Sequence, residues 1–191
     1  MSVFLRSALI AILVTGFLVV TAGRQIMARN SGEELVLEAA PVDPRDILLG
    51  HYVALSYAIE RLDLSALEGD DAFESGDSLF LELTPKDGAA RPLAIYKSRP
   101  AQPGGVILEG RAVTAARAST ENPEGVPGSG RFLIARFDLP RRYYADAETA
   151  LALETELREN GFQVILSQQA GGPPVLKGLI VDGERRVDTV F

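Results

Sequence analysis

Residues 41–57 read PVDPRDILLGHYVALSY, and no other stretch of the chain is as rich in residues that set backbone geometry. With Asp43 as a helix N-cap, Pro44 falls at the first helical position, where its missing N–H leaves no bond unmade. Asp46 then lies in the first turn, where a negative charge suits the helix dipole. The pattern predicts a helix of one to two turns that ends at Gly50.

An alternating apolar run follows Gly50, and we expect this glycine to adopt the left-handed conformation that redirects the chain. Successive side chains of a strand point to opposite faces of a sheet. The run therefore predicts a strand over His51–Arg61 with a core face and a mixed face. The core face is His51, Val53, Leu55, Tyr57 and Ile59, and the mixed face is Tyr52, Ala54, Ser56, Ala58 and Glu60.

The rest of the body shows short apolar runs separated by turn residues, which is typical of a meandering antiparallel sheet or a partly open barrel. Asp182-Gly183 predicts a type I′ hairpin turn, and Ser119–Gly130 has the composition of a loop. The predicted strands are Glu34–Glu38, His51–Arg61, Ser78–Thr84, Pro92–Lys97, Val106–Ala115, Arg131–Leu139, Phe162–Ser167, Val175–Val181 and Glu184–Phe191.

One helix is expected in the body, over Ala147–Asn160. Asp146 is a suitable N-cap, and Gly161 is a suitable left-handed residue after the last turn. The apolar stripe of this helix is narrow, which indicates that one side packs on a sheet. The stripe consists of Ala150, Leu153 and Leu157. The predicted fold class is therefore α+β with β dominant.

The N-terminal segment Ser7–Gly23 has 17 residues without a charge and is flanked by arginines. This length is at the low end for a membrane-spanning helix. The alternatives are a signal peptide cleaved near Ala22 and a buried core helix. We expect an uncleaved anchor with its N-terminus inside the cell. The chain then divides into an anchor over residues 1–29 and, after a polar link near Asn30–Gly32, a body over residues 30–191.

The charge of the body argues against nucleic-acid binding. All 26 acidic residues follow residue 32, whereas 16 of the 19 basic residues do, so the body carries a formal charge of −10. Such a surface is repelled by phosphate backbones. The short pairs Arg141-Arg142 and Arg185-Arg186 are expected at solvated strand or turn edges.

The composition also limits metal and cofactor chemistry. The chain has no cysteine and a single histidine, His51, which excludes thiolate chemistry and zinc sites that need two imidazoles. The acidic segment Glu68–Ser78 could bind calcium through oxygen ligands, but its spacing does not match an EF-hand loop, and a solvated turn is the expected structure. We predict no metal and no cofactor.

The stretch Gly50–Tyr57, GHYVALSY, resembles the motif of the GDYXXLXY family of bacterial proteins, and the preceding PVDPRDILLG is similar to the family's approach to that motif. Looser similarity extends over Arg131–Glu154. The family has no established activity, and the resemblance implies a multi-pass membrane protein as partner. His51 stands where the family has aspartate, which argues against a role there that needs a carboxylate.

The motif residues are therefore interpreted as structural or contact residues, without a catalytic site. They are Asp43, Pro44, Arg45, Gly50, His51, Tyr52, Leu55 and Tyr57. Tyr57 is expected in the core, and Tyr52, on the opposite face, is a candidate for a contact patch. His51 as a base and Ser56 paired with a lysine are the enzymatic alternatives, and neither has a recognisable triad spacing around it.

These observations predict a non-enzymatic, β-rich domain outside the cytoplasm, held by a single-pass anchor in a bacterial inner membrane. Its expected role is to bind or stabilise a membrane protein partner. The competing hypotheses are a membrane-associated hydrolase with an unrecognised site and a β-barrel that binds a small ligand. A filled interior with an exposed patch would favour the partner, and an apolar cavity would favour the ligand.

Overall fold

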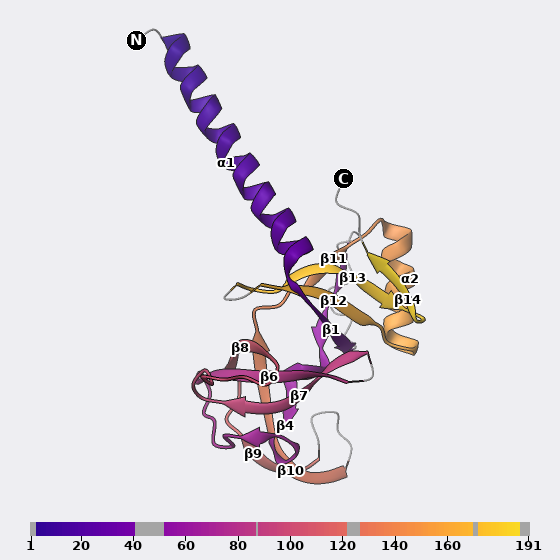
Figure 1. The fold of residues 1–191 in the computed structure, drawn as a ribbon. Coiled ribbons are helices and arrows are strands. Elements are labelled where there is room, and N and C mark those ends of the chain that lie inside the picture. The colour runs from indigo at the N-terminus through magenta and orange to yellow at the C-terminus, as the bar shows by residue number, and fades with distance from the viewer. Residues whose placement is uncertain (1–2, 41–51, 87, 122–126, 170–171, 188–191) are drawn as a thin grey trace.

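A single long helix, α1 (Val3–Ser31), rises from one end of a β-rich body (Figure 1). The computed structural model describes residues 3–40, 52–86, 88–121, 127–169 and 172–187. Within Arg6–Ser31 the most apolar stretch of 18 residues has a mean hydropathy of 1.9, and none of that stretch is buried in the body. The helix is long and apolar enough to cross a membrane, and the alternative of a buried core helix is wrong.

An antiparallel sheet of five described strands lies at the base of α1 (Figure 1). In spatial order the strands are β14 (Glu184–Val187), β13 (Val175–Val181), β12 (Gln163–Gln168), β1 (Glu33–Ala40) and β3 (Ser56–Tyr57). Leu35 and Leu37 of β1 lie opposite Leu166 and Val164 of β12, and all four are buried. This pairing forms the half of the core nearest to α1.

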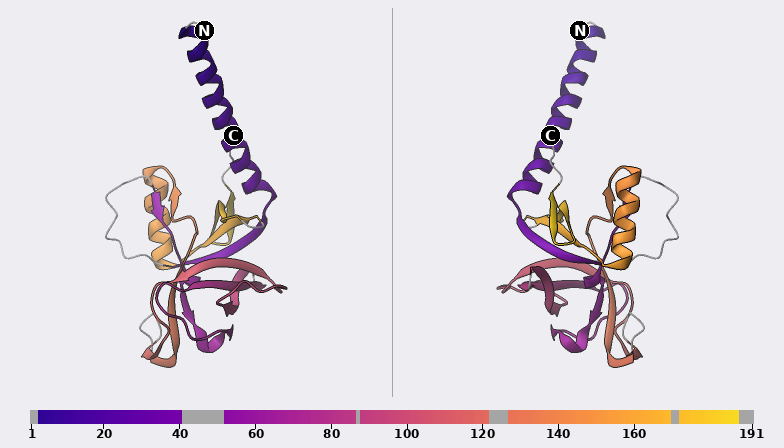
Figure 2. Two further views of the ribbon diagram at one scale, coloured as in Figure 1. Left: turned by 90° about the vertical axis from the view of Figure 1, so that its left-hand side faces the viewer. Right: turned by 90° about the vertical axis from the view of Figure 1, so that its right-hand side faces the viewer.

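The second sheet is strongly curved and lies on the side of the body away from α1 (Figure 2). Its described strands, in spatial order, are β4 (Arg61–Asp63), β10 (Pro127–Phe137), β8 (Val106–Ala112), β6 (Ser78–Lys86), β7 (Ala89–Tyr96) and β5 (Glu68–Gly69), with β9 (Arg117–Glu121) paired to β10. The β5–β7 pair is parallel and the other pairs are antiparallel. Leu79, Leu81 and Leu83 of β6 are completely buried, which agrees with their alternation in the sequence.

The helix α2 (Ala147–Glu159) stands with a small strand pair, β2 (Tyr52–Ala54) and β11 (Arg142–Tyr144), at the end of the body from which α1 rises (Figures 1 and 2). Its predicted ends are confirmed. Asp146 accepts a hydrogen bond from the Thr149 N–H at 3.0 Å, and Gly161 has a φ of +72°. The predicted stripe is also confirmed, since Ala150, Leu153 and Leu157 are all buried. The α+β class with β dominant is therefore correct.

The single strand predicted over His51–Arg61 is wrong, because the chain changes partner every few residues. β2 pairs with β11, and β3 pairs with β1. A 3-10 turn at Ala58–Glu60 then leads into β4, which pairs with β10. This segment crosses from one sheet to the other, so no continuous ladder can form. The predicted core face nevertheless holds for its described members, since Val53, Leu55, Tyr57 and Ile59 are buried.

The connections between the elements agree only partly with the sequence predictions. Asp182 and Gly183 have φ values of 53° and 76°, which confirms the type I′ turn. The loop predicted over Ser119–Gly130 is shorter than expected, because β9 and β10 extend into it and Ser119 pairs with Gly130. The polar link near Asn30–Gly32 is mostly helical, since α1 ends at Ser31 and β1 begins at Glu33. A second 3-10 turn, Leu64–Ala66, follows β4.

Candidate functional site

The structure describes only part of the predicted motif. Tyr52, Leu55 and Tyr57 are described, and they all lie against the segment Pro140–Tyr144. The predictions for Asp43, Pro44, Arg45, Gly50 and His51, including the short helix, concern residues outside the described ranges. The second region of family resemblance, within Arg131–Glu154, is thus the direct structural partner of the motif.

Tyr57 and Leu55 hold this segment from the core side. The Tyr57 side chain is 1% exposed, and its hydroxyl donates to the Pro140 carbonyl oxygen at 2.6 Å. Burial raises the pKa of the Tyr57 phenol well above its usual value, so the hydroxyl remains a donor at physiological pH. The Leu55 N–H donates to the Arg141 carbonyl oxygen at 2.8 Å, and its side chain is buried. On the core side, the motif residues Leu55 and Tyr57 therefore hold the segment around Pro140 and Arg141 in place.

A partly buried ion pair lies next to Tyr57. Arg141 donates to both oxygens of Glu60, with Nη1–Oε2 at 2.7 Å and Nη2–Oε1 at 2.5 Å. The bond to Glu60 raises the pKa of Arg141 above its usual value. Glu60 was expected on the mixed face, and it is instead buried. Arg141 was expected at a solvated edge, and its side chain is partly exposed, at 37%. The 3-10 turn rotates Glu60 into the body, where a carboxylate needs a cation.

The outward side of the same strands carries an aromatic surface that we name the tyrosine patch: Tyr52, Arg142 and Tyr144. The rings of Tyr52 and Tyr144 are 6.1 Å apart and tilted by 60°. The Arg142 guanidinium lies 4.8 Å from the centre of the Tyr52 ring. Tyr144 is 69% exposed, whereas Tyr52 is partly buried. The expectation that Tyr52 faces away from the core toward a surface patch agrees with this arrangement.

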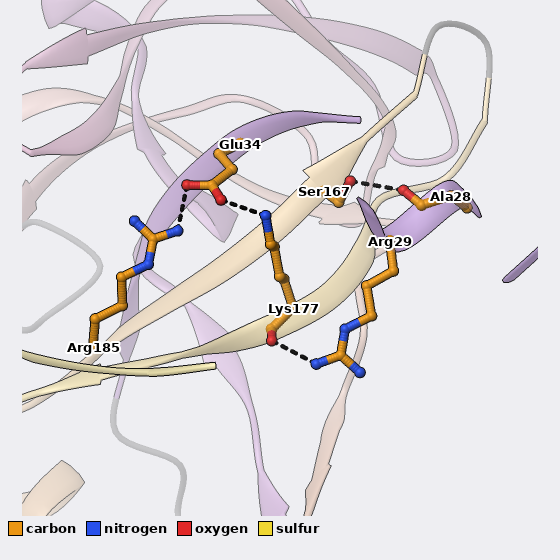
Figure 3. A network of polar contacts seen from close by, with 6 residues as sticks. All are labelled: Ala28, Arg29, Glu34, Ser167, Lys177 and Arg185. Carbon is orange, nitrogen blue, oxygen red and sulfur yellow. Dashed lines mark hydrogen bonds and ion pairs between the residues drawn. The ribbon is translucent and has the colours of Figure 1, made fainter. Parts of the chain in front are cut away.

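The base of α1 is fixed to the five-stranded sheet without a linker (Figure 3). The Ser167 hydroxyl donates to the Ala28 carbonyl oxygen at 2.7 Å, and Arg29 Nη2 donates to the Lys177 carbonyl oxygen at 2.7 Å. Gly32 occupies the close passage between helix and sheet, where a Cβ would lie 2.3 Å from Ser167 Oγ and 2.9 Å from the Gln168 backbone. The helix and the body are therefore coupled directly.

Glu34 extends this junction across three strands (Figure 3). Its carboxylate pairs with Lys177 Nζ on β13 and with Arg185 Nη2 on β14, each at 2.5 Å. Hydrogen bonds from Arg185 and Lys177 lower the pKa of Glu34 below its usual value of 4.5. Arg185 was expected at a solvated strand edge, and this is confirmed, since it is exposed on the outermost described strand of the sheet. Its pair with Glu34 also ties β14 to β1.

Two adjoining grooves lie beside the junction. The first, the junction groove, has a volume of about 620 Å³ and runs between the last turns of α1 and the segments around Pro140 and Pro174. The second, the arginine groove, has a volume of about 940 Å³ and lies over the outward face of β8 and β10. Both have the size of ligand pockets, about 300–1,000 Å³. They meet at Asp138, Leu139, Pro173 and Pro174, which line both.

The segments considered for metal binding and catalysis are engaged in other contacts. Within Glu68–Ser78, Asp70 accepts from the Lys97 N–H, Asp71 pairs with Arg131, and Phe73 is buried. In the described part of the chain, no three histidine, aspartate or glutamate side chains are grouped as metal ligands. Ser56 lies in the β1–β3 ladder opposite Ala40. The side chains of Lys97 and Lys177 contact the carboxylates of Asp77 and Glu34.

The grooves, the junction and a second buried carboxylate were not predicted from the sequence. Glu82 is 5% exposed and accepts from the Gly104 N–H at 2.6 Å. One signal for it was present, since a glutamate in the middle of a strongly apolar strand needs a donor nearby. The junction gave no comparable signal, because its partners are more than a hundred residues apart in the chain.

Comparison with known proteins agrees with the motif. A family model described as GDYXXLXY protein matches residues 14–179, a range that includes the motif, α2 and strands of both sheets. Among curated proteins and among solved structures, nothing matches the chain. Because the family model covers most of the sequence, this protein belongs to the GDYXXLXY family.

Proposed function

We propose that this protein is a non-enzymatic binding domain, anchored in a bacterial inner membrane by α1, with its body on the periplasmic side. Its partner is a multi-pass membrane protein, which it binds or stabilises. The observation that carries this proposal is the tyrosine patch, an exposed aromatic and cationic surface built on the family motif.

The chemistry of the patch supports protein binding. Tyrosine and arginine are enriched at the energetic centres of protein interfaces, where rigid aromatic rings bury a large area at low entropic cost. Tyr144 exposes 69% of its surface. It rests on Tyr52, whose strand is held by the buried residues Leu55 and Tyr57. Because Tyr144 packs on a strand that is itself held in the fold, it can bind a partner with little further loss of conformational entropy.

The position of the patch supports a partner within the membrane. The β2–β11 pair and α2 stand at the same end of the body as the base of α1 (Figures 1 and 2). The junction contacts of Ala28 and Arg29 hold that end at a fixed height relative to the helix. With α1 in a bilayer, the patch lies near the membrane surface, where tyrosine is a preferred residue.

Site-specific cross-linking in native membranes tests the proposal. A photoreactive amino acid in place of Tyr144 should give a covalent adduct with an integral membrane protein. The matched control is the same amino acid at Arg61, an exposed position on β4 in the sheet farther from α1. The proposal fails if position 144 gives no protein adduct, or if both positions give the same adducts.

A further inference from the structure

The two grooves adjoin and together form one depression, which begins at the last turns of α1. Ala22 and Ile26 of α1 line the junction groove. The shared residues Asp138, Leu139, Pro173 and Pro174 then connect it to the arginine groove. A ligand could therefore contact the apolar helix at one end and the outward face of β8 and β10 at the other.

The arginine groove has an unusual charge arrangement. Arg111 of β8 and Arg136 of β10 are paired directly in the antiparallel register, so their side chains lie on the same face. Like charges in that arrangement destabilise a sheet. Neither guanidinium has a carboxylate oxygen within ion-pair distance among the described residues, and Arg111 donates instead to the Gly76 carbonyl oxygen at 3.0 Å. The Arg111–Arg136 pair therefore lowers the stability of the sheet. An anion bound between the two guanidinium groups would relieve their repulsion.

The remaining charged side chains that line this groove leave it cationic. Arg99 adds a third guanidinium, while Glu109 and Asp138 are the carboxylates. The local formal charge is thus +1, in a body that has 26 acidic and 16 basic residues. Closely spaced arginines favour binding of a phosphate group, because their guanidinium N–H donors match its oxygen atoms.

The junction groove is mostly apolar, with Gln25, Arg29 and Asp138 as its polar lining residues, and suits an acyl chain. Its lining includes Ile26, Leu139, Val175 and Leu176, together with Pro140, Pro173 and Pro174. Prolines have no backbone N–H, so an extended peptide in this groove would find few donors for its carbonyl groups. A hydrocarbon chain has no such requirement. Ala22 and Ile26 also continue the lipid-facing surface of α1, which leads a chain from the bilayer to the groove.

We propose that the depression binds one anionic phospholipid, with an acyl chain in the junction groove and the headgroup phosphate at Arg111 and Arg136. This inference shares with the proposed function only the placement of α1 in a bilayer. It requires no protein partner, and the tyrosine patch is not part of it.

Native mass spectrometry of the full chain in an uncharged detergent tests the lipid site. The probes are phosphatidylglycerol, phosphatidylcholine with the same chains, and glycerol phosphate. We expect phosphatidylglycerol to bind most tightly. The double variant Arg111→Gln/Arg136→Gln should weaken its binding by about tenfold or more, because two charge-assisted hydrogen-bond donors are lost. The melting temperature of this variant should be unchanged or higher, since the like-charge pair is removed.

The matched control is Arg61→Gln/Arg117→Gln, which removes the same charge at exposed positions outside both grooves and should alter binding by less than about twofold. Equal binding of both phospholipids, or equal loss in both double variants, overturns the site. Equal binding of glycerol phosphate identifies a soluble anion and overturns the acyl-chain part.

A photoreactive phosphatidylglycerol provides an independent measurement on the wild-type chain. It should label residues 107–112 or 172–176, and labelling confined to α1 overturns the proposal. The Tyr144 cross-link should persist in Arg111→Gln/Arg136→Gln, so that failure of the lipid site and failure of partner binding are distinguishable.

Discussion

At the scale of single residues, the described part of the family motif acts by holding one neighbouring segment. The Tyr57 hydroxyl donates to the Pro140 carbonyl oxygen, and the Leu55 N–H donates to the Arg141 carbonyl oxygen. Glu60, three residues after the motif, binds the Arg141 side chain. Tyr52 lies on the other side of the strands and joins the exposed patch. The core side of the motif thus fixes the segment Pro140–Tyr144. On the surface side, Arg142 and Tyr144 of that segment pack beside Tyr52.

Truncation of Leu55 should show how much the core side contributes to folding. The side chain is 3% exposed, so Leu55→Ala leaves a cavity and should lower the free energy of unfolding by about 2–5 kcal/mol. Chemical denaturation of the full chain in detergent measures the change. Leu151→Ala on the exposed side of α2 is the control and should have an effect below about 1 kcal/mol. Similar losses in the two variants would contradict the packing role of Leu55.

The hydroxyl of Tyr57 gives a second prediction. Tyr57→Phe keeps the ring and removes the donor to the Pro140 carbonyl, which then loses its partner in a partly buried place. The free energy of unfolding should fall by about 1–2 kcal/mol. Tyr144→Phe should change it by less than about 0.5 kcal/mol, because that ring is exposed. An unchanged stability for Tyr57→Phe would show that the hydroxyl is not needed to hold the segment.

At the scale of elements, the junction between α1 and the five-stranded sheet decides how the body is presented. The helix passes into β1 through Gly32, with Ser167 and Arg29 as side-chain clamps. Glu34 then ties β1 to β13 and β14. The bonds of Ala28 and Arg29 join α1 to β12 and β13, so rotation of α1 against the body would break both together.

The carboxylate of Glu34 makes this junction sensitive to acid. Its pKa is lowered by Arg185 and Lys177, so the folded state binds the proton less readily than the unfolded state. Its stabilisation is therefore complete above the usual carboxyl pKa of 4.5 and is lost as the pH falls through the lowered value. Glu34→Gln should lower the melting temperature at about pH 7 and reduce its decline between about pH 5 and pH 3.

Melting curves over this pH range, followed by circular dichroism, measure the effect. Glu184→Gln, at an exposed position in the adjacent hairpin, is the matched control and should retain the acid dependence of the wild-type chain. A Glu34→Gln variant with the wild-type pH profile would show that the pairs with Lys177 and Arg185 contribute nothing to stability.

At the scale of the whole molecule, an apolar helix is joined to an acidic body. The junction groove is lined partly by α1, whereas the arginine groove lies over β8 and β10 of the second sheet. The body's charge of −10 repels anionic headgroups in general. The arginine groove is a local exception to that charge.

Membrane retention is the prediction at this scale. The apolar residues of Ser7–Gly23 favour insertion by about 3–5 kcal/mol before the polar and small residues are counted. The protein should remain in the membrane fraction after an alkaline wash, and protease should digest the body from the outer side. Leu13→Arg/Phe17→Arg, with two charges in mid-span, should abolish retention. Release of the wild-type chain by the wash would contradict the anchor.

The sequence by itself determined the elements whose signals are local. α1, the ends and stripe of α2, the Asp182-Gly183 turn and the alternation of Leu79, Leu81 and Leu83 each depend on residues within a few positions of one another. The motif was sufficient to indicate the family, which the family model then confirmed. Periodicity and capping are properties of a short segment, so they can be recognised without knowledge of the fold.

Only the tertiary structure decided which segments meet. The segment His51–Arg61 is divided among three pairings whose partners lie in β11, β1 and β10. The Glu60–Arg141 ion pair and the contacts of α1 with Ser167 and Lys177 join residues 81 to 148 positions apart. The two grooves arise in the same way, where α1, the end of β10 and the start of β13 come together. Local sequence carries no record of these pairings, because many partners satisfy the same alternation and burial selects among them only when the sheets pack.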